Sequence, residues 1–131
     1  MKYYQFNMTD FAMIQSKIYE NNKAKGWYDE PRSNGEIIAL IHSELSEALE
    51  ADRKNDEGEY IPPDCRRIES DKEFKMYFES EVKDSYWDEM ADAMIRILDH
   101  AQHNGIDLAG HIQAKVRYNE LRPHKHGGKK Y

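Results

Sequence analysis

The sequence has one cysteine, four prolines and no long hydrophobic run, and each shortage excludes a class of protein. Cys65 has no partner for an internal disulfide and no neighbouring cysteine ligand, so we assign it no role. The longest apolar run, residues 37–41, is far below the roughly 20 residues that span a bilayer. The first residues also lack a signal-peptide core. We therefore expect a cytoplasmic protein without a membrane segment.

An excess of positive charge is also lacking. The formal net charge is −6, whereas a general nucleic-acid binder usually presents a basic face to the phosphates, so we expect no nucleic-acid partner. The last part of the chain departs from this balance, because six basic residues follow Ala114 against Glu120 alone. A basic tail of about residues 123–131 suits either a lid over a small polyphosphate or a solvated, disordered end.

Apolar residues are in short supply for one domain of 131 residues. They make up 39% of the chain, against 34% charged residues. A single domain is the natural organisation at this length, and we assign residues 1–131 to it. So little apolar material suits thin helical layers that an oligomer completes, and we expect a homodimer or homotetramer.

The hydrophobic pattern is helical, because apolar residues recur at three- and four-residue steps and no segment alternates with period two. Asn7 or Thr9 can cap a first helix, Ser33 with Glu36 resembles a capping box, and Asp107 can cap a last one. We predict helices over about 7–25, 36–55, 71–78, 82 or 86–103, and 107–121. Residues 59–70, with Pro62-Pro63, read as a loop. The expected fold is all-α: a four- to five-helix bundle with this loop and the short helix inserted.

Two pairs of carboxylates stand inside the most hydrophobic helices. Glu44 and Glu47 are three residues apart, and Glu89 and Asp92 repeat that spacing, so each pair shares a helix face. Four carboxylates meeting in a partly buried space repel one another unless a cation compensates. An all-oxygen site suits a hard cation such as Mg²⁺, with Mn²⁺ as a substitute.

The same residues have a plainer interpretation. A Glu-x-x-Glu pair in an acidic helical chain is usually a solvated face, and Arg53 and Arg96 could neutralise part of the charge without metal. His42, beside the acidic residues, is either a ligand or a structural histidine. Trp27, in the loop before the first carboxylate helix, either stacks on a nucleobase or caps the core.

The two carboxylate segments resemble a known family. Residues 40–50, Leu-Ile-His-Ser-Glu-Leu-Ser-Glu-Ala-Leu-Glu, and residues 88–94, Asp-Glu-Met-Ala-Asp-Ala-Met, are similar to the paired signature of MazG-like nucleotide pyrophosphohydrolases, the all-α superfamily related to dCTP pyrophosphatase and all-α dUTPases. Ser43 replaces the first glutamate of that signature, and the spacing between the segments is longer than usual. The resemblance implies metal binding by Glu44, Glu47, Glu89 and Asp92.

The resemblance extends to the last predicted helix, where Lys115, Asn119 and Arg122 match a Lys-x-x-x-Asn-x-x-Arg pattern associated with substrate binding. It implies Mg²⁺-dependent hydrolysis of an NTP or dNTP between the α- and β-phosphates. Any of the four carboxylates could act as general base, and we choose Glu47. Trp27 is a further candidate substrate contact because of its place in the loop before the first carboxylate helix. Two alternatives stay open: a non-catalytic helical oligomerisation module, and a phosphohydrolase acting on another phosphorylated nucleotide or phosphoribosyl compound.

Overall fold

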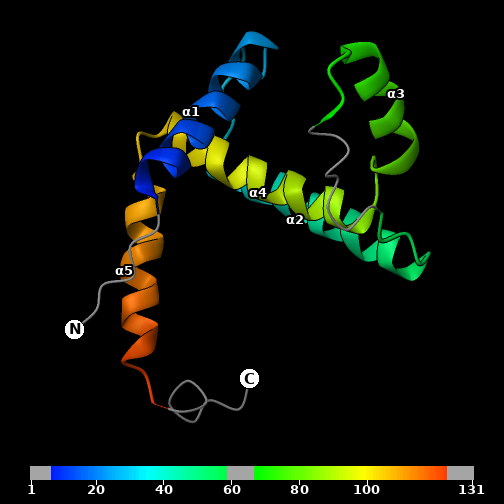
Figure 1. Ribbon diagram of the computed structural model, residues 1–131. Coiled ribbons are helices and arrows are strands. Elements are labelled where there is room, and N and C mark those ends of the chain that lie inside the picture. The colour runs from blue at the N-terminus through cyan, green and yellow to red at the C-terminus, as the bar shows by residue number, and fades with distance from the viewer. Residues whose placement is uncertain (1–6, 59–66, 124–131) are drawn as a thin grey trace. The chain divides into compact units, whose positions relative to one another are not determined.

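The computed structural model describes residues 7–58 and 67–123 of the chain. Within those residues the fold is all-α, with five helices and no strand, as the periodicity predicts (Figure 1). The helices are α1 (Met8–Ala24), α2 (Asn34–Arg53), α3 (Asp71–Glu81), α4 (Tyr86–His103) and α5 (Leu108–Glu120). Most of the predicted loop at 59–70, Cys65 and the basic tail from residue 124 lie outside the described residues.

The predicted helix starts are confirmed by their caps. Asn7 accepts a hydrogen bond from the backbone N–H of Asp10 at 3.1 Å, which selects it over Thr9 as the cap of α1. Ser33 and Glu36 form the reciprocal capping box of α2. Asp107 accepts from the N–H of Gly110 at 2.9 Å and so begins α5.

The region between α3 and α4 differs in detail from the prediction. α3 continues to Glu81 rather than ending near Phe78, because no proline or glycine interrupts it there. Val82 is its C-cap, and Asp84 takes a positive φ of 62° in the turn that follows. α4 therefore begins at Tyr86, the later of the two predicted starts.

The chain divides into two compact units, and the boundary between them falls within α4, after Ile97. The first unit contains α1, the last turns of α4 and α5. The second unit is Glu30–Ile97 and contains α2, α3 and most of α4. The predicted single-domain organisation stays a prediction.

Buried amide side chains join the elements of the first unit. Gln15 on α1 donates to the Gln102 side chain at 3.0 Å and to the backbone oxygen of Ile106 at 3.1 Å. Asn22 donates to the buried carboxylate of Asp99 at 3.0 Å. These bonds join α1 to the end of α4.

In the second unit, α2 and α4 lie side by side and antiparallel. The backbone N–H of Tyr86, at the start of α4, donates at 2.9 Å to the oxygen of Asp56, just after α2. Gly58 allows this close approach: its φ is +72°, and a Cβ there would clash with the Oγ of Ser85. The seam between the helices is lined by buried alanines: Ala48, Ala51 and Ala93. Small side chains at these positions let the two helices approach closely.

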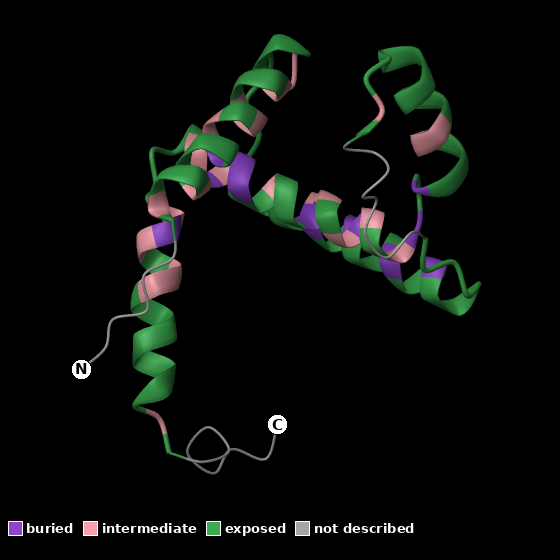
Figure 2. Ribbon diagram, in the orientation of Figure 1, coloured by how far each residue is buried: buried purple, intermediate pink, exposed green. Residues whose placement is uncertain are grey.

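The apolar residues that recur at helical spacing on α2 and α4 were expected to face inward, but several are exposed in the single chain. Ile41, Ala48, Leu98 and Ala101 are buried as expected, but these are not: Leu45, Leu49, Met94 and Ile97. Figure 2 shows how much of the surface of the helices is exposed (green). The periodicity identified apolar positions correctly, but it does not say whether a neighbour within the chain covers them.

None of the described helices combines the length and the apolar character needed to cross a bilayer.

Candidate carboxylate metal centre

Glu44 lies on the buried stripe of α2. The buried residues of that helix, Ile41, Glu44, Ala48 and Ala51, follow the three- and four-residue steps of one helical face. Glu44 is 6% exposed, and Glu89 on the facing helix is 5% exposed. Two carboxylates are therefore held in the alanine-lined seam between α2 and α4, where water cannot fully solvate them.

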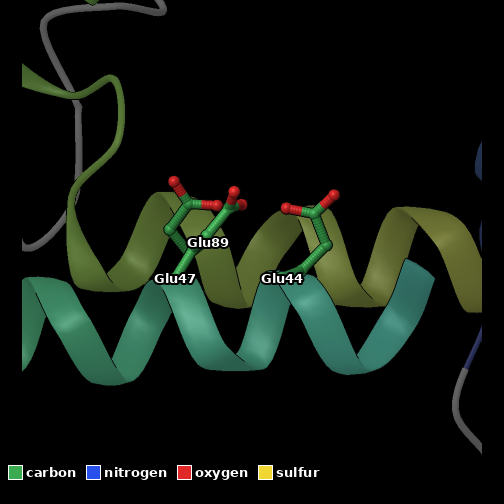
Figure 3. A group of neighbouring side chains, drawn as sticks. All are labelled: Glu44, Glu47 and Glu89. Atoms are coloured by element: carbon green, nitrogen blue, oxygen red, sulfur yellow. The ribbon is translucent and has the colours of Figure 1, made fainter. Parts of the chain in front are cut away.

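Glu47 joins these two residues from the edge of the seam. Ligand oxygens of Glu44, Glu47 and Glu89 all lie within 4.8 Å of one another. Figure 3 shows the three side chains on the same side of α2 and α4. Glu47 is the exposed member of this carboxylate trio, so the group is open to solvent on one side. Three carboxylates so arranged could hold a metal ion.

Arg96 forms an ion pair with Glu44 of the trio. Its Nε lies 2.5 Å from Oε1 of Glu44, and the arginine side chain is 24% exposed. From the sequence, both Arg53 and Arg96 are possible counter-charges for the carboxylates. In the structure, Arg53 instead pairs with exposed Glu50 at 3.9 Å. Arg96 thus neutralises one charge of the trio.

The electrostatics of the trio reflect this crowding. Burial, the charge of Glu47 and a hydrogen bond with Glu44 raise the pKa of Glu89 to about 8. A hydrogen bond with Glu44, together with burial, raises the pKa of Glu47 as well. Burial alone would raise the pKa of Glu44, but hydrogen bonds from Arg96 and Glu47 outweigh it and lower that pKa. At neutral pH the trio therefore retains a proton, which a divalent cation could replace.

Asp92, the fourth predicted ligand, lies one turn after Glu89 on α4 but is not a member of the trio. It is half-buried, and burial followed by the charges of Asp88 and Glu44 raises its pKa to about 6. Since the charges of Glu44 and Glu47 both act on it, Asp92 belongs to the same electrostatic cluster.

A pocket of about 360 Å³ adjoins Asp92 on the side of α3. We call it the α3 pocket; its lining residues are Phe74, Lys75, Phe78, Glu79, Lys83, Asp84, Asp88 and Asp92. Sequence reasoning missed every one of these except Asp92. The available signal was the spacing of Phe74 and Phe78, which places two rings on one face of a helix beside the carboxylate helix.

The predicted substrate-binding residues near the end of the chain lie in the other unit. Lys115 and Asn119 are exposed on α5, four residues apart on one face, and the ammonium of Lys115 lies 4.8 Å from the centre of the Tyr118 ring. Arg122 follows the C-cap of α5 and is therefore outside the helix, unlike the other two. It is half-buried.

Two further candidate residues, Trp27 and His42, lie outside the trio. Trp27 is half-buried in the turn after α1, where its backbone N–H donates to the oxygen of Asn22 at 3.0 Å. This position fits both predicted alternatives for the ring. His42 is exposed on α2 and contributes no ligand atom to the trio.

Comparison of the chain with protein-family models, curated proteins and solved structures found no match. The resemblance to MazG-like enzymes therefore depends on the short motifs alone.

Proposed function

We propose that the protein is a Mg²⁺-dependent nucleoside triphosphate pyrophosphohydrolase that cleaves an NTP or dNTP between the α- and β-phosphates. The observation that carries the proposal is the carboxylate trio, whose ligand oxygens lie within 4.8 Å of one another. Like charges held close together in a partly buried site lower the stability of the fold, and a cation that binds among them offsets this cost. The order of the MazG-like motifs supports a nucleoside triphosphate as the substrate that binds through this cation.

The donor set fits magnesium. Glu44, Glu47 and Glu89 would hold it, with Asp92 as the fourth carboxylate. Hard divalent cations prefer such all-oxygen sites, and Mn²⁺ would substitute. When bound there, the ion supplies positive charge to the phosphate oxygens and lowers the pKa of an attacking water.

The protein side chains have distinct roles in this proposal. Glu47 is the exposed member of the trio, so it can reach a water molecule and accept its proton as general base. Arg96 fixes the orientation of Glu44 through their ion pair. Lys115 and Arg122 would offset phosphate charge, and Asn119 would donate to phosphate, sugar or base.

We also propose that the enzyme is a homodimer or homotetramer. Five large apolar side chains of α2 and α4 are between 45% and 51% exposed: Ile38, Leu45, Leu49, Trp87 and Met94. Covering such residues with a second copy removes apolar surface from water, which stabilises association. Size-exclusion chromatography with light scattering tests this assembly, and a monomer at micromolar concentration would contradict it.

The function is tested by incubating the purified protein with each common NTP and dNTP in the presence of Mg²⁺ and measuring pyrophosphate. We expect release from at least one nucleotide, and loss of that release with EDTA. Glu47→Gln should abolish turnover, whereas Glu50→Gln, the same change at an exposed position of α2, should not. If no nucleotide yields pyrophosphate, the helical oligomerisation module becomes the better interpretation.

A further inference from the structure

The α3 pocket has the size of a small-molecule site. Its volume of about 360 Å³ falls within the range of about 300–1,000 Å³ typical of ligand pockets. All its walls belong to the Glu30–Ile97 unit that also holds the carboxylate trio. The pocket is therefore a defined feature of that unit, and of its lining residues only Asp92 has a role proposed above.

Two aromatic rings form one wall of the pocket. Phe74 and Phe78 lie on successive turns of α3, with ring centres 5.8 Å apart and planes inclined by 38°. Phe74 is 39% exposed despite its apolar ring. Phe78 is half-buried. An aromatic pair that lines a concave site offers an apolar π-surface on which a planar group such as a nucleobase stacks.

The charges of the pocket favour an uncharged ligand end. Four carboxylates line it against two ammonium groups, Lys75 and Lys83. Lys75 also pairs with Glu79 at 3.9 Å. A triphosphate would be repelled by this excess of negative charge, whereas carboxylate oxygens accept hydrogen bonds from amino and hydroxyl groups. The pocket therefore suits the nucleoside part of a nucleotide rather than its phosphates.

Asp92 connects the pocket to the carboxylate trio. It lines the α3 pocket, and it lies one turn from Glu89, with the charges of Glu44 and Glu47 acting on it. A nucleotide joins a phosphate chain to a nucleoside by one covalent bond. It therefore needs two adjoining sites, one that binds the charged phosphates and one that binds the uncharged nucleoside. In the neighbouring wall, Asp88 accepts a hydrogen bond from the backbone N–H of Asp84 at 2.9 Å.

We infer that the α3 pocket is the nucleoside subsite of this enzyme, in which the base stacks on Phe74 and Phe78. The carboxylates of Glu79 and Asp88 favour a base with an exocyclic amino group, such as cytosine or adenine, over uracil or thymine. This inference depends on the proposed function for the location of the phosphates.

The test compares Phe74→Leu and Phe78→Leu with the wild type. Leucine keeps the apolar bulk but has no ring, and Met76→Leu is the matched control, because Met76 is 63% exposed on α3 and does not line the pocket. Circular dichroism and thermal melts establish that each variant is folded. Losing one stacked base should raise KM for the best nucleotide by between about 5-fold and about 150-fold.

Inorganic tripolyphosphate separates the two sites, because it carries the phosphate chain without a nucleoside. Its inhibition constant should be the same for wild type and Phe78→Leu. If KM for the nucleotide is unchanged in both phenylalanine variants, the pocket is not the nucleoside subsite, while the proposed function stands. A rise in both constants would show general damage to the carboxylate site and would also overturn the inference.

A direct binding measurement keeps the inference testable if the protein hydrolyses no nucleotide. Isothermal titration with cytidine, adenosine and uridine should show binding that weakens in Phe78→Leu and is kept in Met76→Leu. Uridine should bind most weakly of the three. Absence of nucleoside binding by the wild type, or equal binding by the wild type and Phe78→Leu, would contradict the subsite.

Discussion

The affinity of the protein for Mg²⁺ should rise steeply between pH 6 and pH 8. The metal binds ionised carboxylates, and in the metal-free protein the pKa of Glu89 is about 8. The ionised fraction of Glu89 is then about 1% at pH 6 and about one half at pH 8, so the apparent association constant should increase about 50-fold. Asp92, with a pKa of about 6, adds about a further factor of two.

Isothermal titration with MgCl₂ at pH 6, 7 and 8 and constant ionic strength measures this dependence. Glu89→Gln should bind Mg²⁺ more weakly and lose most of the pH dependence, and Glu50→Gln should keep the wild-type profile. An affinity for Mg²⁺ that is independent of pH, or that weakens towards pH 8, would refute the assignment of Glu89 as a metal ligand that is protonated in the metal-free protein.

The same pKa shift determines how the metal-free protein responds to pH. The folded state raises the pKa of Glu89 from 4.5 to about 8, so it binds that proton more tightly than the unfolded chain does. This contribution to stability is present below about pH 4.5 and is lost as the pH rises towards 8. In thermal melts, added Mg²⁺ should therefore stabilise the protein most at the alkaline end of this range.

Four substitutions test other parts of the account. Arg96→Met should lower the free energy of unfolding of the metal-free protein by about 1–3 kcal/mol, because it removes the partner of a buried carboxylate, and Mg²⁺ should restore part of that loss in urea titrations. Arg53→Met, at an exposed ion pair, should change it by less than about 1 kcal/mol, and equal effects would contradict this. Gly58→Ala should destabilise by more than about 1 kcal/mol in the same titrations, since its φ is +72° and Ser85 occupies the space a Cβ needs; a neutral effect would refute that. Leu45→Glu should shift the light-scattering mass towards the monomer, and an unchanged oligomer would exclude Leu45 from the interface.

The helices could be predicted from the sequence because local chemistry determines where they begin. The Ser33–Glu36 capping box and the Asp107 cap are complete within four residues, so each is visible without tertiary information. The end of α3 was missed, since a helix without a terminating glycine or proline stops where its turn packs, which local sequence does not determine.

The candidate site was predictable only in part. The three-residue spacing within each carboxylate pair places its members on one face, but the sequence does not determine the register between α2 and α4. That register brings Glu89 to Glu44 and Glu47 and leaves Asp92 outside the trio. The ion pair of Arg96 with Glu44 depends on the same register.

The α3 pocket was missed for a different reason. Phe74 and Phe78 belong to the short inserted helix, whose apolar residues are equally typical of core packing. Only the fold places their rings opposite Asp88 and Asp92. A pocket built from separate elements has no signature in a single segment of sequence.

The identity of the products tests the central claim most directly. Phosphorus NMR of a nucleoside triphosphate incubated with the wild-type protein and Mg²⁺ should show the nucleoside monophosphate and pyrophosphate appearing together. Neither product should form with Glu47→Gln. Release of orthophosphate with a nucleoside diphosphate would contradict cleavage between the α- and β-phosphates, and an unchanged spectrum for every nucleotide would contradict the enzyme itself.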